Sequence, residues 1–252
     1  MHFLNYFGDS LQGYACRVTD IKNYVDKGVT VYKTIKLEKP EGFSYRAGQF
    51  AMLAHPELKQ HNSDELLWRA FSIASSPLQD FLEFTLLIKY TGGLTQYIEQ
   101  NLDVGSTLMV RGPFGSFCLD KSLSRIVFVA TGCGITPLIS MLRTLLIEGT
   151  DKRLQFFYGF RNANQFLYRE ELEEYARKYD NFDFYAAASD DPDWPGFKGY
   201  VNPLLTEHAF KGADTHFYVC GSPVAMESII NHLKNLGYLE TNIHTERWVT
   251  KR

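Results

Sequence analysis

Three residues in the first third of the chain carry side chains that can act on one ligand. In Arg69-Ala-Phe-Ser72 a cation, an aromatic ring and a hydroxyl lie within four positions. Arginine can pair with a phosphate through two hydrogen bonds, Phe71 can lie against a planar ring, and Ser72 can hydrogen-bond to a ring nitrogen. In a strand, Arg69 and Phe71 face one way and Ser72 the other, so one ligand reaches all three only across a strand end or bend. A strand with an arginine at its tip and a core phenylalanine fits the same pattern.

Two glycine-rich turns open predicted helices further along the chain. Gly92-Gly-Leu-Thr95 precedes a helix expected over 94–102, where free backbone amides and the helix dipole favour an anion. A simple helix cap at Thr95 explains this turn as well. Thr131-Gly-Cys-Gly-Ile-Thr-Pro137 follows a buried strand and opens a helix, as a dinucleotide phosphate turn does. It departs from the full G-x-G-x-x-G pattern because Pro137 stands at the third glycine position.

Together, the strand and the two turns predict one site for a flavin and another for a dinucleotide. FAD is favoured over FMN because Arg69 and the 92–95 turn offer two phosphate-binding elements. The two sites in one chain predict hydride transfer between two bound cofactors, in which the protein must bring the reacting atoms to roughly 3–3.5 Å.

The composition indicates the class of protein. Of 252 residues, 45% are hydrophobic and 22% are charged, as in globular proteins. The net charge of −3 argues against a general nucleic-acid binder. No window holds the ~18 uncharged apolar residues of a membrane span, and the first residues lack a secretory leader. We therefore expect a soluble, cytoplasmic protein with no nucleic-acid partner and no membrane span.

Cysteine and histidine positions argue against disulfides and metal sites. The four cysteines show no C-x-x-C pair and no iron–sulfur spacing; they are Cys16, Cys118, Cys133 and Cys220. The seven histidines are scattered without metal-ligand spacing. We expect reduced cysteines and no metal, so electrons must leave for a separate acceptor.

The pattern of elements changes near residue 120. Before it, short strands separated by turns predict a barrel or sandwich, with strands over 29–37, 49–54, 68–74, 81–88 and 107–111 and turns at 75–77 and 112–115. Lys33 interrupts the apolar face of the first of these strands, which we therefore expect to be bent or partly exposed there. After residue 120, strands over 125–130, 154–158, 182–188, 215–220 and around Ile243 alternate with helices from Pro137 to near Gly149 and over 167–179 and 226–236. This alternation predicts a parallel sheet, and we place the domains at 1–120 and 121–252.

The ordered set of motifs resembles the ferredoxin–NADP reductase superfamily over nearly the whole chain. Arg69-Ala-Phe-Ser72 is similar to its R-x-[YF]-S flavin signature, Gly92 to Thr95 to its flavin-phosphate loop, and Thr131 to Pro137 to its nicotinamide-dinucleotide turn. Further similar segments are Tyr45-Arg-Ala-Gly-Gln-Phe50, Gly112 to Gly115, Tyr158-Gly-Phe-Arg161, Cys220-Gly-Ser-Pro with Met226, and Glu246-Arg-Trp248. The resemblance implies an N-terminal antiparallel β-barrel that binds flavin and a C-terminal α/β parallel-sheet domain that binds the nucleotide.

The resemblance also implies residue roles. Ser72, Cys220 and Glu246 would surround the point of hydride transfer, and Phe71 would pack on one flavin face. Trp248 would lie near the other face, although here Val249-Thr-Lys-Arg252 follows it. The implied cofactor-binding residues are Arg69, Phe71, Ser72, Gly92, Gly93, Leu94, Thr95, Thr131, Gly132, Gly134, Pro137, Arg161, Gly221, Met226 and Trp248. Cys220 as a small buried residue and Trp248 as a packing anchor remain alternatives.

The implied function is a flavoprotein reductase that takes hydride from NADH or NADPH to FAD. The electrons would pass to a ferredoxin, a flavodoxin, an oxygenase component or a small acceptor. A reductase of free flavin and a non-catalytic flavin-binding sensor or subunit are the alternatives. We favour NADH, because Asp190 and Asp191 follow the third strand of the nucleotide domain where NADP users often carry Ser-Arg; Arg161 and Lys198 argue the other way.

Overall fold

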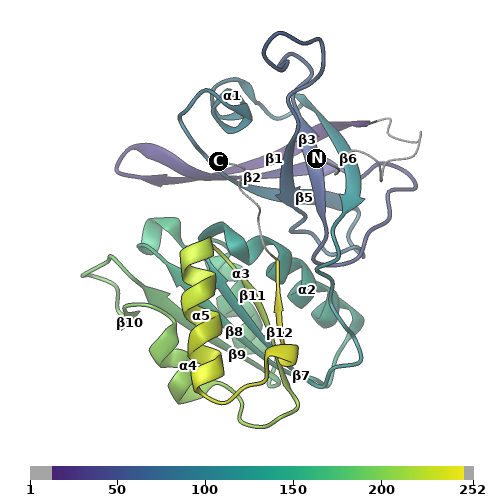
Figure 1. The fold of residues 1–252 in the computed structure, drawn as a ribbon. Helices are drawn as coiled ribbons and strands as arrows, with labels where there is room; N and C mark the ends of the chain where they lie inside the picture. Colours follow the sequence, from purple (N-terminus) through teal and green to yellow (C-terminus); the bar gives the residue numbers. More distant parts are fainter. Residues whose placement is uncertain (1–12, 247–252) are drawn as a thin grey trace.

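The first half of the chain folds into an antiparallel barrel. The computed structural model describes residues 13–246. The barrel strands are β1 (Tyr14–Asp26), β2 (Val29–Glu38), β3 (Phe50–Ala54), β4 (Arg69–Ser72), β5 (Phe81–Leu87) and β6 (Thr107–Phe114), in the order β4-β3-β6-β1-β2-β5. A bridge between Ile73 and Phe84 joins the two ends of this order and closes the barrel. Figure 1 shows these strands above the second domain, with α1 (Leu94–Asn101) at their side.

Three features of the barrel differ from the sequence predictions. Strand β1 was missed, because most of its side chains are exposed and polar and only Cys16, Val18 and Tyr24 are buried. Lys33 does not open β2 to solvent: it is 3% exposed and pairs with Glu99 of α1 at 2.9 Å. The expected turn at 112–115 begins later, since β6 continues to Phe114.

The second half forms a parallel sheet with helices on both faces. Its strands are β7 (Arg125–Thr131), β8 (Arg153–Phe160), β9 (Phe182–Ala188), β10 (Phe197–Lys198), β11 (Thr215–Cys220) and β12 (Ile243–Thr245), in the order β10-β9-β8-β7-β11-β12. Its helices are α2 (Ile135–Glu148), α3 (Arg169–Lys178), α4 (Asn202–His208) and α5 (Pro223–Asn235). The predicted two-domain fold is confirmed; β10 and α4 were not predicted. Among the described residues, no helix is long and apolar enough to cross a membrane.

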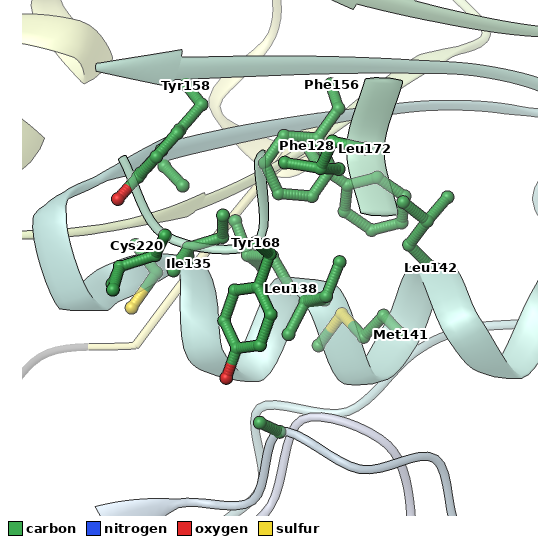
Figure 2. Close-up of a cluster of buried hydrophobic side chains, with 14 of the residues drawn as sticks. Phe128, Ile135, Leu138, Met141, Leu142, Phe156, Tyr158, Tyr168, Leu172 and Cys220 are labelled. Carbon is green, nitrogen blue, oxygen red and sulfur yellow. The ribbon is translucent and has the colours of Figure 1, made fainter. Parts of the chain in front are cut away.

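Alternation along β7 divides the core of this domain into two layers. Phe128 and Ala130 pack toward α2 and α3, whereas Val127 and Val129 pack with residues of α4 and α5 on the other face. Figure 2 shows the first layer, where side chains of α2 lie against Phe128 and Phe156.

Helix α2 is buried along its polar positions as well as its apolar ones. We expected an amphipathic helix; the barrel covers the polar face, so Ser140, Arg143 and Thr144 are each no more than 6% exposed. A second contact joins the domains at the tip of the β1–β2 hairpin. There the Asp26 carboxylate accepts hydrogen bonds from Asn162 at 2.9 Å and Gln165 at 2.8 Å.

Arg143 is the charged centre of the domain interface. Its Nη1 donates to Glu83 Oε1 of the barrel at 2.8 Å and to the Ala74 carbonyl at 2.9 Å. Its Nε and Nη2 each donate to one oxygen of Glu171 on α3 at 2.7 Å. Burial acts to raise the pKa of Glu171, but the hydrogen bonds and charge of Arg143 outweigh it and lower that pKa. The guanidinium therefore holds one carboxylate from each domain.

Replacing Arg143 with methionine should destabilise the protein by about 3–5 kcal/mol, because the Glu83 and Glu171 carboxylates would stay buried without their cation. Chemical denaturation followed by circular dichroism would measure the loss. Adding Glu83→Gln and Glu171→Gln should recover part of it. The control is Lys121→Met, which breaks a pair with Glu148 in which the lysine is 54% exposed and should cost under about 1 kcal/mol. Equal losses from Arg143→Met and Lys121→Met would contradict this account.

Candidate functional site

A cleft of about 1410 Å³ lies between the two domains. The barrel lines it with β4, the end of β5 and the turn before α1. The second domain lines it with the ends of β7 and β8, the turn before α2 and the start of α5. The nucleotide-domain wall is thus the edge of the sheet where its parallel strands reach their carboxyl ends, which is where open α/β sheets bind ligands.

On the barrel wall, Arg69, Phe71 and Ser72 all line this one cleft. Arg69 is exposed and donates a hydrogen bond to the neighbouring Trp68 carbonyl at 2.8 Å. Phe71 is partly buried against the barrel core, and Ser72 is 4% exposed. Because the strand ends at Ser72, the cleft reaches both of its faces, as the sequence pattern required.

The turn before α1 presents backbone amides to the same cleft. Gly92, Gly93, Leu94 and Thr95 all line it. Within residues 13–246 no side chain caps the helix at Gly93. Gln96 Oε1 accepts from the Gly92 amide at 2.8 Å, and the Thr95 hydroxyl accepts from the Lys89 amide at 3.1 Å. A cap by Thr95 therefore does not describe this turn, and the uncapped N-terminus of α1 favours an anion.

On the opposite wall, the Thr131–Gly134 turn carries the chain from β7 into α2. Gly132 has φ +52°, a left-handed conformation that favours glycine. A Cβ on Gly134 would collide with the Cys220 carbonyl, and one on Gly221 would collide with the Thr131 hydroxyl. These glycines let the turn after β7 and the segment after β11 approach each other closely, and α2 begins there without a side-chain cap.

Several predicted site residues lie elsewhere. Pro137 is buried in the first turn of α2, Met226 packs in the layer beneath α5, and Cys220 is 0% exposed in the layer beneath α2. Figure 2 shows Cys220 beside Ile135 within that layer. None of the three is among the described residues that line the cleft. Trp248 lies outside the described residues.

Three buried polar atoms have no hydrogen-bond partner among residues 13–246: Ser72 Oγ and Thr131 Oγ1, which belong to lining residues of the cleft, and Glu246 Oε2, whose residue interacts with Ser72 but is not among the lining residues. Ser72 and Thr131 line opposite walls, and Glu246 follows β12. The Ser72 hydroxyl faces Glu246 closely enough to lower its pKa, although Ser72 Oγ does not reach hydrogen-bond geometry. An unpaired buried polar group costs roughly 1–3 kcal/mol, so these atoms are suited to contact a bound group.

Burial raises the pKa of Glu246 to about 7, against the smaller opposing effect of Ser72. An unfolded glutamate titrates near 4.3, so between these values the folded protein holds a proton that the unfolded chain has lost. The stability that the neutral carboxyl contributes is complete below the unfolded pKa and is lost as the pH rises through about 7.

Two cations of the second domain, Arg161 and Lys198, each contact an oxygen of the segment 190–192. Arg161 lines the cleft, and its Nε pairs with Asp190 Oδ2 at 2.9 Å. Asp191 accepts from the Ala163 amide at 2.9 Å, and Lys198 donates to the Pro192 carbonyl at 2.6 Å. Asp191 therefore holds the backbone at Ala163, and Asp190 forms an ion pair with Arg161.

Sequence reasoning missed cleft residues that the fold alone brings in. Tyr32 of β2 reaches the dinucleotide turn, where its hydroxyl would lie 3.1 Å from a Cβ on Gly132. Lys89 follows β5 and adds a cation to the same cleft. Neither residue belongs to a sequence motif. They line the cleft because the fold brings the barrel and the second domain together.

Replacing Glu246 with glutamine should remove the pH dependence described above. We expect the variant to gain stability over the wild type as the pH rises from about 5 to about 8, by at most about 3 kcal/mol, because glutamine cannot ionise. Thermal unfolding of both proteins across this range would measure the difference. A difference that stays constant or shrinks with rising pH would contradict the raised pKa.

Comparisons with known proteins match both halves of the chain. The oxidoreductase FAD-binding domain model matches residues 16–118, and the oxidoreductase NAD-binding domain model matches residues 128–232. Phenol hydroxylase P5 protein from Acinetobacter pittii is 30% identical over 98% of this chain, which covers 68% of that protein. The reductase component of phenol 2-monooxygenase from a Pseudomonas species is 34% identical over 86% of this chain, which covers 60% of it.

The fold has the same relatives. A ferredoxin NADP+ reductase from Neisseria gonorrhoeae, solved with bound FAD and NADP, superposes with a TM-score of 0.78 at 19% identity, covering 93% of this chain and 98% of that one. The order of domains, the cleft and the matched models agree with one another. The chain belongs to the ferredoxin–NADP reductase superfamily and carries its FAD-binding and NAD-binding domains.

Proposed function

We propose that this chain is an NAD(P)H-dependent flavoprotein reductase in which both cofactors meet in the interdomain cleft. The observation that carries the proposal is the set of unpaired buried atoms of Ser72, Thr131 and Glu246, contributed by both domains. A binding module has no need of such groups on two facing walls. When bound, the nicotinamide supplies a hydride, and FAD accepts it and can release electrons singly.

The residues of this chain bind and orient. Arg69 and the N-terminus of α1 at the 92–95 turn would hold the flavin phosphates, and Phe71 would lie against its ring. The Thr131–Gly134 turn would hold the dinucleotide phosphates. Ser72 would offer its unpaired hydroxyl at the reacting edge, and Glu246, neutral below about pH 7, would add a second polar group there. Cys220 belongs to the core, and its carbonyl lies close to Gly134 of the turn before α2.

The electron acceptor is proposed to be a separate partner. Relatives of this chain include a reductase component of phenol 2-monooxygenase, so an oxygenase component is our first candidate, ahead of a ferredoxin or a flavodoxin. We place the domain boundary near residue 120, between the two matched regions. A cytoplasmic location remains a prediction from the sequence.

Two variants on one strand should separate flavin binding from hydride transfer. Arg69→Ala should lose FAD on dialysis because a charged phosphate contact is removed. Ser72→Ala should keep FAD but be reduced more slowly by NADH, with kcat and kcat/KM falling together, about tenfold. Absorbance after dialysis and anaerobic stopped-flow reduction would measure these effects. Wild-type protein that binds flavin but is reduced by neither donor would favour a sensor, and protein isolated without flavin would favour a free-flavin reductase.

Donor choice should depend on the Arg161–Asp190 pair. We expect the wild type to prefer NADH, because Asp190 holds the cation that a 2′-phosphate would need. Asp190→Asn should raise the kcat/KM ratio of NADPH to NADH about tenfold, equivalent to roughly 1.4 kcal/mol, with ferricyanide as acceptor. The control Arg161→Ala/Asp190→Asn should abolish the gain. A wild-type preference for NADPH of about tenfold or more would overturn this assignment.

A further inference from the structure

The two walls of the cleft are held together by hydrogen bonds between the barrel and α2, which lie outside the segments 69–72 and 131–134 that line the cleft. The turn 74–76 comes directly after the Phe71–Ser72 wall, and α2 comes directly after the Thr131–Gly134 wall. Side chains of α2, in the second domain, form hydrogen bonds with this turn. We call this set of contacts the clamp; it consists of residues 74–76 with Ser140, Arg143 and Thr144.

The clamp consists of short, buried hydrogen bonds. Ser140 Oγ donates to the Ser75 carbonyl at 2.6 Å, and Arg143 Nη1 donates to the Ala74 carbonyl at 2.9 Å. The hydroxyls of Thr144 and Ser76 lie 2.9 Å apart. The three α2 residues are spaced i, i+3 and i+4, so they share one face of the helix.

The turn has no freedom to slide along α2. Ser75 and Ser76 are both 0% exposed. Tyr45 of the barrel donates to the Ser75 carbonyl at 3.0 Å, so this oxygen is held from both domains at once. The Ala74 amide donates to the Glu83 carbonyl at 2.7 Å. Moving the turn would therefore break several buried hydrogen bonds together, at a cost set by their exclusion from water.

We propose that Ser140, Arg143 and Thr144 are positioning residues for hydride transfer, which they serve by fixing the separation of the two cleft walls. This inference rests on the proposed function. Transfer requires the reacting atoms at roughly 3–3.5 Å, and a displacement of about 1 Å can cost about a hundredfold in rate. The phosphate-binding turn of each cofactor lies within its own domain. Loosening the clamp therefore lowers the rate at saturation and leaves the affinity for each cofactor in place.

The test uses Ser140→Ala/Thr144→Val, which removes two hydroxyls but keeps Arg143 with its carboxylate partners. The control is Thr215→Val, since Thr215 is 0% exposed and its hydroxyl donates to the Phe210 carbonyl inside the second domain at 3.3 Å. Measurements on the FAD-loaded proteins are the limiting rate of reduction at saturating NADH, the Kd of NAD⁺ by calorimetry, flavin content after dialysis, and hydrogen–deuterium exchange of the peptide spanning 70–79.

For the double variant we expect a limiting rate about tenfold lower, faster exchange in the 70–79 peptide, and a Kd and flavin content within about twofold of wild type. Thr215→Val should change neither rate nor exchange. Thr144→Ser, which keeps the hydroxyl, should retain the wild-type rate, and Thr144→Val alone provides the test if the double variant fails to fold.

A double variant with the wild-type limiting rate would overturn the inference and leave the proposed function intact. A fall in NAD⁺ affinity at an unchanged limiting rate would overturn it too. If NADH and NADPH both fail to reduce the wild type, the proposed function falls and the inference falls with it.

Discussion

A guanidinium taken out of water must keep its partners, and at Arg143 those partners belong to different domains. Glu83 comes from the barrel and Glu171 from a helix of the second domain. Separating the domains would leave Arg143 with Glu171 but would break its pair with Glu83, whose buried environment makes this loss more costly than that of a surface pair. The ion pairs of Arg143 with Glu83 and Glu171 thus hold the two domains in one arrangement. Every other feature of the site depends on it, because the cleft has one wall in each domain.

Contacts at the domain interface also account for the strained backbone of Tyr168. Tyr168 adopts φ +56° although it is not glycine, and it is buried. Its hydroxyl lies 2.5 Å from that of Thr85 in the barrel, and its ring lies beneath the Arg143 guanidinium at 5.0 Å. Contacts across the interface thus offset a backbone conformation that costs about 1–3 kcal/mol. The second domain is shaped in part by the first.

An element was predicted well where its own residues show the burial pattern, and poorly where neighbouring elements determine its position. Strand β11 was predicted with the bounds it has, because a nearly continuous buried apolar run is recognised without knowledge of the rest of the fold. Strand β9 was also predicted with its bounds, although Asp183 and three other residues of it are only partly buried. The two glycine-rich turns were placed before α1 and α2 correctly because glycines beside a strand and a helix carry a local signature, whereas their cofactor-binding role stays a proposal. Strand β1 was missed because barrel neighbours, rather than its own polar pattern, hold it in place.

The polar residues between the domains could not be predicted in the same way. Ser140 and Thr144 match the polar face of an ordinary surface helix, and Lys33 matches an interruption of an apolar strand face. Each is buried only because a second element supplies its partner. Periodicity reports the nearest neighbours of a residue, whereas these partners lie more than 60 positions away along the chain.

The burial of α2 on both of its faces has a consequence for exchanging parts between relatives. A hybrid cut near residue 120 would join this barrel to a foreign helix whose polar face had been selected against a different turn. The glycine turns of both domains would be intact, yet the hybrid would keep the contacts to the Ala74–Ser76 segment only if the foreign helix carried equivalents of Ser140, Arg143 and Thr144. The unit that can be transplanted is therefore the barrel together with the buried face of α2 that packs on it, although α2 belongs to the second domain in sequence.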